Sequence, residues 1–168
     1  MDDDFRRKVP CTGRLVPDNF KVPEKMTHER FLMRPLTVRD VVKDYDAVMH
    51  SRKRIVGVFG DSWPSPDLTF EQDLIDLGWH QKEFQRRTSF AYTLMAPDES
   101  KCIGCVYIFP SPKKQYDAAV FFWVTDEEYA RGLDGILSSF LLEWITKWPF
   151  KNVAFPGRKT PWKEWNSK

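Results

Sequence analysis

The sequence has few cysteines, no long apolar run and almost no excess of either charge. Three of its 168 residues are cysteine, an odd number that does not make a disulfide framework. No stretch approaches the roughly 20 apolar residues of a membrane-spanning helix. The acidic residues after Met1 are unlike the basic start of a secretory signal. We therefore expect a reduced, cytoplasmic protein that does not enter a membrane.

The charges are nearly balanced, with Lys+Arg 26 against Asp+Glu 24 and a net charge of +2. A nucleic-acid-binding domain usually gathers basic residues on one face, and this composition has no such excess. No nucleic-acid partner is expected. Tyr107, Phe109, Phe121 and Trp123 have rings that can stack on RNA bases, but they lack basic neighbours. We expect these four rings to be buried.

Signature motifs of several enzyme classes are missing, namely G-x-S-x-G, the P-loop, H-E-x-x-H and G-x-G-x-x-G. The one C-x-x-C, from Cys102 to Cys105, lies in a predicted strand. Residues three apart on a strand point to opposite faces, so we expect the two sulfurs to share neither a metal nor a disulfide. No second C-x-x-C or histidine pair completes a site. We expect buried structural cysteines and no metal.

The chain length suits one domain that buries roughly 70% of its unfolded surface. Residues 1–26 contain three prolines, many charges and no sustained periodicity, which is typical of an extended N-terminal arm. Phe20 and Val22 are the side chains of this arm that can dock on the rest. Residues 27–168 are expected to form the single domain.

Hydrophobic periodicity predicts eight elements in the order β-α-α-β-β-β-α-β. They are the strand Phe31–Leu36, the helices Val38–Arg54 and Thr69–Arg87, the strands Ser89–Met95, Cys102–Phe109 and Asp117–Val124, the helix Leu133–Lys147 and the strand Asn152–Phe155. The strand Asp117–Val124 is apolar on both alternating faces, which indicates a central strand covered on both sides. The sequence therefore predicts an α/β fold with helices on both faces of the sheet.

The helix Thr69–Arg87 has the clearest start signal, because Thr69 and Gln72 have capping-box spacing. Its predicted apolar face consists of Phe70, Leu74, Leu77 and Phe84. His80 lies among charged residues and is expected on the surface. Most carboxylates on or near this helix are expected to face solvent, and none is singled out as a base: Asp61, Glu71, Asp73, Asp76 and Glu83.

Residues 117–148 combine an apolar strand, a polar loop with Gly132 and Gly135, and an amphipathic helix. Such a loop leaves unpaired backbone N–H groups at the helix start. With the helix dipole behind them, these groups can hold a phosphate. The unit therefore predicts a phosphate-bearing cofactor.

Three features resemble the GNAT-type N-acetyltransferase superfamily over about residues 31–155. They are the element order, the opening Phe31–Leu36 with Asp40 after it, and the strand-loop-helix unit from Ala118 to Trp148. The resemblance implies a mixed central sheet and acetyl-CoA, or a related acyl-CoA, as co-substrate without a metal. It implies acyl transfer to a small-molecule or peptide amine by direct attack in a ternary complex. A homodimer stays open.

The resemblance also implies roles for individual residues. The pantetheine arm would lie along Phe122, Trp123 and Val124. The pyrophosphate would lie against Arg131, Gly132, Leu133, Asp134 and Gly135. This loop departs from the family's Arg/Gln-x-x-Gly-x-Gly/Ala pattern, because Asp134 and Ile136 fill the glycine positions counted from Arg131. Asp134 either belongs to a modified cofactor loop or only caps the helix.

The segment after the last strand is a second departure. Family members usually carry a fourth helix there, often with a Tyr that protonates the departing thiolate, and residues 156–168 contain no Tyr, His or Cys. Tyr129 and Tyr107 are the nearest substitutes by position, and both also have a purely structural interpretation. Two hypotheses remain: an acyl-CoA-dependent N-acyltransferase, or a catalytically inactive binding or regulatory module with the same fold.

Overall fold

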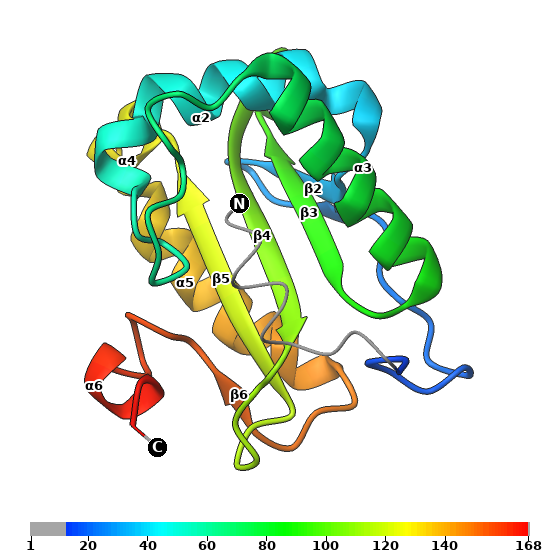
Figure 1. Cartoon of the computed structure of the whole chain (residues 1–168). Helices are drawn as coiled ribbons and strands as arrows, with labels where there is room; N and C mark the ends of the chain where they lie inside the picture. The colour runs from blue at the N-terminus through cyan, green and yellow to red at the C-terminus, as the bar shows by residue number, and fades with distance from the viewer. Residues whose placement is uncertain (1–12, 168) are drawn as a thin grey trace.

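The computed structural model describes residues 13–167 and has the expected α/β fold (Figure 1). The strands are β1 Met26–Thr27, β2 Leu32–Pro35, β3 Phe90–Met95, β4 Cys102–Pro110, β5 Ala118–Val124 and β6 Val153–Ala154. The helices are η1 Val38–Asp40, α2 Val41–Ile55, α3 Phe70–Arg86, α4 Asp126–Ala130, α5 Leu133–Trp144, η2 Ile145–Lys147 and α6 Trp162–Trp165. Among the described residues, no helix is long and apolar enough to cross a membrane.

The six strands form one mixed sheet in sequence order. All neighbouring strands are antiparallel except β5 and β6, which are parallel. The pairing between β5 and β6 covers only Ala118 with Val153 and Ala119 with Ala154. From Val120 onward, β5 therefore has an edge that β6 does not cover.

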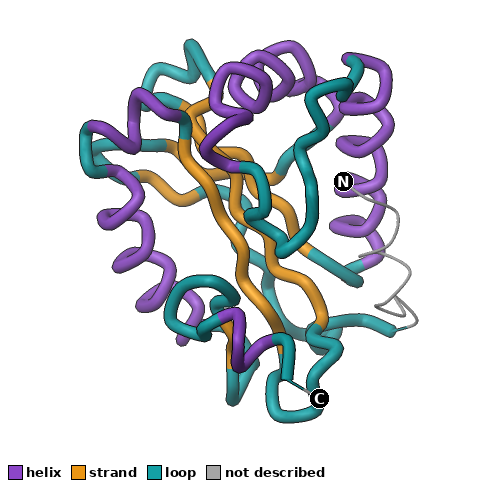
Figure 2. The backbone as a smooth tube through the Cα atoms, turned by 60° about the vertical axis from the view of Figure 1, so that its left-hand side comes forward, coloured by secondary structure: helices purple, strands orange, loops and turns teal. Residues whose placement is uncertain are grey.

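Helices cover both faces of the sheet, with α2 and α3 on one side and α5 on the other (Figures 1 and 2). Every residue of β5 is buried. Its alternate side chains separate as the sequence predicts: Ala118, Val120, Phe122 and Val124 join the core under α5, and Ala119, Phe121 and Trp123 join the core under α2 and α3. The four rings expected to be buried are all buried, namely those of Tyr107, Phe109, Phe121 and Trp123.

The described part of the arm packs against the domain. The N–H of Leu15 donates to the carbonyl of Arg87 at 2.7 Å, and the Arg87 guanidinium donates to the carbonyls of Pro17 and Phe20. Phe20 and Val22 contact the core under α5, which confirms the predicted docking. Residues 1–12, the remainder of the predicted arm, lie outside the described residues.

The buried face of α3 differs from the predicted one. Thr69 caps the helix as expected, since its hydroxyl accepts from the Gln72 N–H at 3.1 Å. The buried residues, however, are Asp73, Asp76, Leu77 and His80, whereas Phe70 and Leu74 are 43% and 38% exposed. The expectation of a surface His80 was therefore wrong, and Asp73 and Asp76 are two buried exceptions among the five carboxylates of which most were expected to face solvent. These positions also follow helical spacing, and polar groups of α2 and β4 lie opposite them.

Candidate functional site at the open edge of β5

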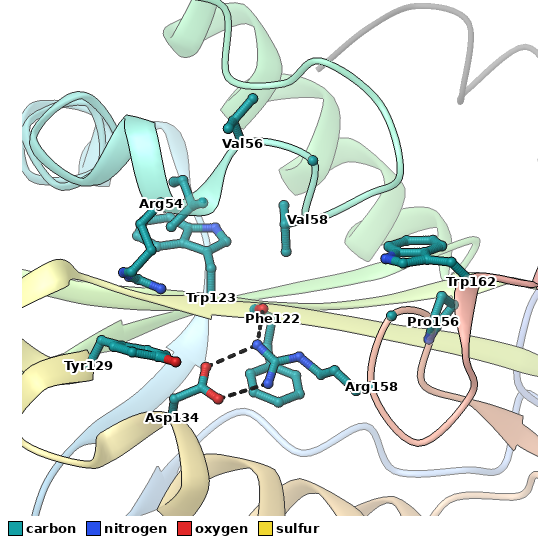
Figure 3. Close-up of a pocket in the computed structure, with 13 residues that line it drawn as sticks. Arg54, Val56, Val58, Phe122, Trp123, Tyr129, Asp134, Pro156, Arg158 and Trp162 are labelled. Carbon is teal, nitrogen blue, oxygen red and sulfur yellow. Dashed lines mark hydrogen bonds and ion pairs between the residues drawn. The ribbon is translucent and has the colours of Figure 1, made fainter.

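A cleft of about 320 Å³ lies where β5 and β6 part. Its walls are the end of α2 with the following loop, the middle of β5, Tyr129 of α4, Asp134 of α5, and the segment after β6 (Figure 3). The cleft brings together only some of the residues expected to bind a cofactor: Phe122, Trp123 and Asp134 line it. The others lie outside its lining, namely Val124, Arg131, Gly132, Leu133 and Gly135.

The carbonyl groups on the open edge of β5 already accept hydrogen bonds. A Cβ on Gly104 would strike the carbonyl oxygen of Trp123, so that oxygen faces β4. Successive carbonyls of a strand alternate in direction, and those of Phe122 and Val124 therefore face the open edge. Arg158 Nη2 donates to the Phe122 oxygen at 3.1 Å, and Arg54 Nη2 donates to the Val124 oxygen. Two guanidinium groups thus occupy the edge on which an extended ligand would bind.

Arg158 also pairs with Asp134 across the mouth of the cleft. Its Nη1 and Nη2 lie 2.8 and 2.9 Å from the two carboxylate oxygens, a bidentate arrangement. The guanidinium carbon is 3.5 Å from the centroid of the Phe122 ring, within the range of a cation–π contact (Figure 3). We call this set of contacts from Arg158 to Asp134 and Phe122 the Arg158 bridge. It joins the segment after β6 to the start of α5.

A tight turn after β6 directs Arg158 into the cleft. Gly157 has φ +74°, a conformation that L side chains rarely adopt. A Cβ there would lie 2.6 Å from the indole ring of Trp162 in α6. The turn therefore requires glycine for its backbone conformation and for the close approach of Trp162. In the sequence, the only signal for the bridge is an Asp at a helix start and an Arg after a Pro-Gly pair.

The first turn of α5 is open to an anion. Gly132 is the N-cap residue with φ +81°, and the N–H groups of the first turn have no intrahelical acceptor. A Cβ placed on Gly132 or Gly135 would meet nothing within 4 Å, so space is free beside both glycines. Asp134 does not provide the N-cap, since its carboxylate binds Arg158. The N–H groups of the first turn attract a phosphate, whereas the nearby Asp134 carboxylate repels it.

The segment before α5 contains a short helix. The acidic residues of α4 pair with cations: Arg54 with Asp126, Lys101 with Glu127, and both Arg30 and the helix's own C-cap Arg131 with Glu128. The Glu128 side chain is buried and makes these contacts at 3.1 and 2.8 Å. Arg131, expected at the pyrophosphate, therefore pairs with Glu128.

The two tyrosine candidates have opposite surroundings. Tyr129 is 51% exposed and lines the cleft, and the Arg54 guanidinium lies 4.4 Å from its ring centroid. Tyr107 is buried under α3, and its hydroxyl accepts from Trp123 Nε1 at 3.1 Å. Burial and the neighbouring Cys105 raise the pKa of Tyr107 well above its usual value. Only Tyr129 offers a hydroxyl among the residues that line the cleft.

Comparisons with known proteins give structural matches only. No family model and no curated protein matches the chain. A ribosomal-protein-S5-alanine acetyltransferase from Vibrio fischeri aligns with TM-score 0.59 and 16% identity, over 74% of this chain and 68% of that one. A GNAT-family acetyltransferase described as putative, from Bordetella pertussis, aligns with TM-score 0.57 and 16% identity, over 74% and 73%.

A ribosomal L7/L12 alpha-N-protein acetyltransferase aligns with TM-score 0.52 and 13% identity, over 76% of this chain and 70% of that one. At such identities the likeness shows the fold and not the activity. The chain therefore has the GNAT-type N-acetyltransferase fold.

Proposed function

We propose that this chain, with its N-acetyltransferase fold, binds an acyl-CoA between β5 and β6 and transfers the acyl group to an amine. The observation that carries the proposal is the parting of these strands beside a helix start with free N–H groups. The pantetheine arm would follow the edge from Phe122 to Val124. The pyrophosphate would lie at the first turn of α5, near Gly132 and Gly135.

The two ends of this site differ in how well they suit the ligand. The phosphate end suits it, because free space lies beside both glycines. The pantetheine end requires a rearrangement, because Arg54 and Arg158 occupy the outward carbonyls. An amide of the pantetheine arm would replace Arg158 on the Phe122 oxygen. The released guanidinium can then bind the pyrophosphate, for which its planar donor fork is suited.

The acyl-CoA supplies an activated thioester, and the chain supplies position and polarisation. The N–H of Val124 faces the same edge as its carbonyl and can donate to the thioester oxygen. An amine held in the cleft attacks the thioester carbon, forming the C–N bond as the C–S bond breaks. Tyr129 would donate a proton to the departing thiolate and would recover one from the amine nitrogen, which loses a proton as the amide forms. The acceptor would be a small-molecule or peptide amine.

Calorimetric titration of the full chain with CoA and acetyl-CoA tests the binding. We expect saturable binding that Gly135→Trp removes, because the new side chain fills the space at the start of α5. Ser139→Trp, exposed on the same helix, is the matched control and should bind like the wild type. Absence of binding to the folded wild type at millimolar ligand would end the proposal.

A second candidate is a binding or regulatory module without catalysis. Its support is the Arg158 bridge, which occupies the Phe122 oxygen where an amide of the pantetheine arm would bind. A panel of amines incubated with acetyl-CoA separates the two candidates. Turnover that Gly135→Trp abolishes favours the enzyme. Binding without turnover, for every amine and at every pH tried, favours the module.

A further inference from the structure

A second group of reactive side chains lies inside the domain, outside the lining of the cleft. It consists of Asp44 on α2 with Cys102 and Cys105 on β4, all three buried. One ligand atom from each residue lies within 4.8 Å of the others. Cys105 Sγ donates to Asp44 Oδ1 at 3.2 Å. Two thiols and a carboxyl group therefore converge between α2 and the sheet.

A β-bulge brings the two sulfurs together. Met95 pairs with Cys102 and Leu94 with Gly104, so Ile103 is an extra residue in β4. The extra residue changes the alternation along the strand. Cys102 and Cys105 consequently both belong to the core under α2 and α3, and Ile103 belongs to the core under α5. The prediction that the sulfurs lie on opposite faces was wrong for this reason.

A fourth donor lies beside the cluster. Asp73 on α3 is 2% exposed, and its Oδ2 has no hydrogen-bond partner. Asp73 and Asp44 together line a small cavity of about 10 Å³, roughly the space of one water molecule. Neither carboxyl group forms an ion pair with another described residue.

Asp73 Oδ2 is the atom of this group that hydrogen bonds leave unsatisfied. Buried acidic groups are normally paired with a cation or coordinate a metal, and an unpartnered buried oxygen is rare. A divalent ion held by the cluster would give that oxygen a partner.

We propose that Cys102, Cys105, Asp44 and Asp73 bind a zinc ion. Zinc takes sulfur at about 2.3 Å and carboxylate oxygen at about 2.0–2.2 Å in a tetrahedron, which places ligand atoms about 3.3–3.8 Å apart. The ligand atoms of Asp44, Cys102 and Cys105 lie within 4.8 Å of one another, so these three need only a small contraction. The cavity beside Asp44 gives the Asp73 side chain room to turn toward the ion.

The ligand chemistry favours zinc over harder cations. Thiolates select zinc and other soft ions, whereas calcium and magnesium prefer sites made of oxygen. Binding would replace the two thiol protons and any carboxyl protons with the ion, so protons would be released. Because the site is closed, the ion would enter as the chain folds and would link α2, α3 and β4. The inference does not depend on acyl-CoA binding.

The test uses the full chain, refolded without metal and titrated with Co²⁺ as a spectroscopic probe. We expect one Co²⁺ per chain, a thiolate-to-cobalt charge-transfer band, the visible bands of a tetrahedral ion, and displacement by Zn²⁺. Cys102→Ser and Cys105→Ser should each weaken the charge-transfer band. Cys11→Ser, which leaves the C-x-x-C intact, should keep the full spectrum. Asp73→Asn should keep the band but weaken Co²⁺ binding by at least about 10-fold, the smallest loss typical when only an outer-shell partner of a metal ligand is removed.

Several outcomes would overturn the proposal. One is a folded wild type, verified by circular dichroism, that binds Co²⁺ without a thiolate band. Another is a spectrum lost equally in Cys11→Ser. A Cys102–Cys105 disulfide in the unreduced protein, found by mass spectrometry, would assign the pair to redox chemistry instead. Unchanged affinity in Asp73→Asn would remove Asp73 as a ligand. The spectra of the wild type and of Cys11→Ser are enough to refute the proposal. It therefore stays testable even if Cys102→Ser or Cys105→Ser fails to fold.

Discussion

Replacing Asp134 with Asn should change stability and ligand affinity in opposite directions. Asp134 holds Arg158 in a bidentate pair whose side chains are 28% and 21% exposed, and it lies in the first turn of α5. Asn keeps one acceptor oxygen but removes the charge. The lost ion pair and helix-dipole interaction together are worth about 1 kcal/mol at this exposure. We therefore expect the Tm to fall by about 2–4 °C.

The same substitution should tighten acyl-CoA binding. A phosphate at the first turn of α5 would lie about one helical turn, ~6 Å, from the Asp134 carboxylate. At that distance, two like charges repel by about 0.7 kcal/mol in water and about 3 kcal/mol near a protein surface. Asn removes this repulsion and frees Arg158 to bind the phosphate. A gain in binding free energy between these two limits, about 1–2 kcal/mol, corresponds to a roughly 5–30-fold lower Kd.

Thermal denaturation and calorimetry with CoA measure the two effects. The affinity gain should shrink as salt rises, because screening weakens the repulsion that Asn removes. Glu127→Gln is the matched control, since it changes the net charge equally and its side chain is 62% exposed beside Lys101. The reasoning fails if Asp134→Asn binds CoA no more tightly than the wild type. It fails equally if Glu127→Gln produces the same gain.

Three further substitutions test other parts of the structure. Tyr129→Phe should lower turnover of acetyl-CoA about 10²-fold or more with little change in CoA affinity, as expected for loss of a general acid. Steady-state kinetics measure the turnover and calorimetry measures the affinity, and equal losses in both would contradict the role. Glu128→Gln should destabilise the domain by about 2–4 kcal/mol in urea unfolding, because Arg30 and Arg131 lose a buried partner; an unchanged midpoint would contradict it. Asp117→Ala should lower the Tm at pH 7, because the Asp117 carboxylate accepts from the N–H groups of Asn152 and Lys151, and these bonds lower its pKa. Because the pKa of Asp117 is lower in the folded state, its carboxylate stabilises the fold at every pH above its unfolded-state pKa of about 3.9. This stabilisation is lost as the pH falls through the folded-state pKa, so the Tm values of wild type and variant should converge in acid.

The sequence contains enough information for the layers of the fold. The strand β5 shows a two-residue alternation on both faces, and each face packs as this pattern predicts. The amphipathic character of α5 and the Thr69 cap of α3 follow from helical spacing and side-chain chemistry for the same reason. Such features depend on neighbours within a few residues, and a local pattern therefore captures them.

Features that depend on distant partners were mispredicted or missed. The face of α3 that carries Asp73 and His80 is buried because polar groups of α2 and β4 lie opposite it, which no pattern within the helix reveals. The bulge at Ile103 places Cys102 and Cys105 on the same face of the sheet. It shows only in the pairing of β4 with β3, a distant segment. Arg158 reaches Phe122 and Asp134 only because β6 leaves β5 after two residue pairs.

The Arg158 bridge also couples the C-terminal segment to the cleft thermodynamically. If a ligand must displace Arg158 from the Phe122 oxygen, bound ligand and anchored segment exclude each other in part. Linkage then makes the two effects equal. Release of residues 156–167 raises the ligand's affinity by some factor, and bound ligand shifts the equilibrium of this segment toward its released state by the same factor. Hydrogen exchange in this segment should therefore accelerate when the ligand in the cleft carries no pyrophosphate to hold the released Arg158, although ligands usually slow exchange near their sites.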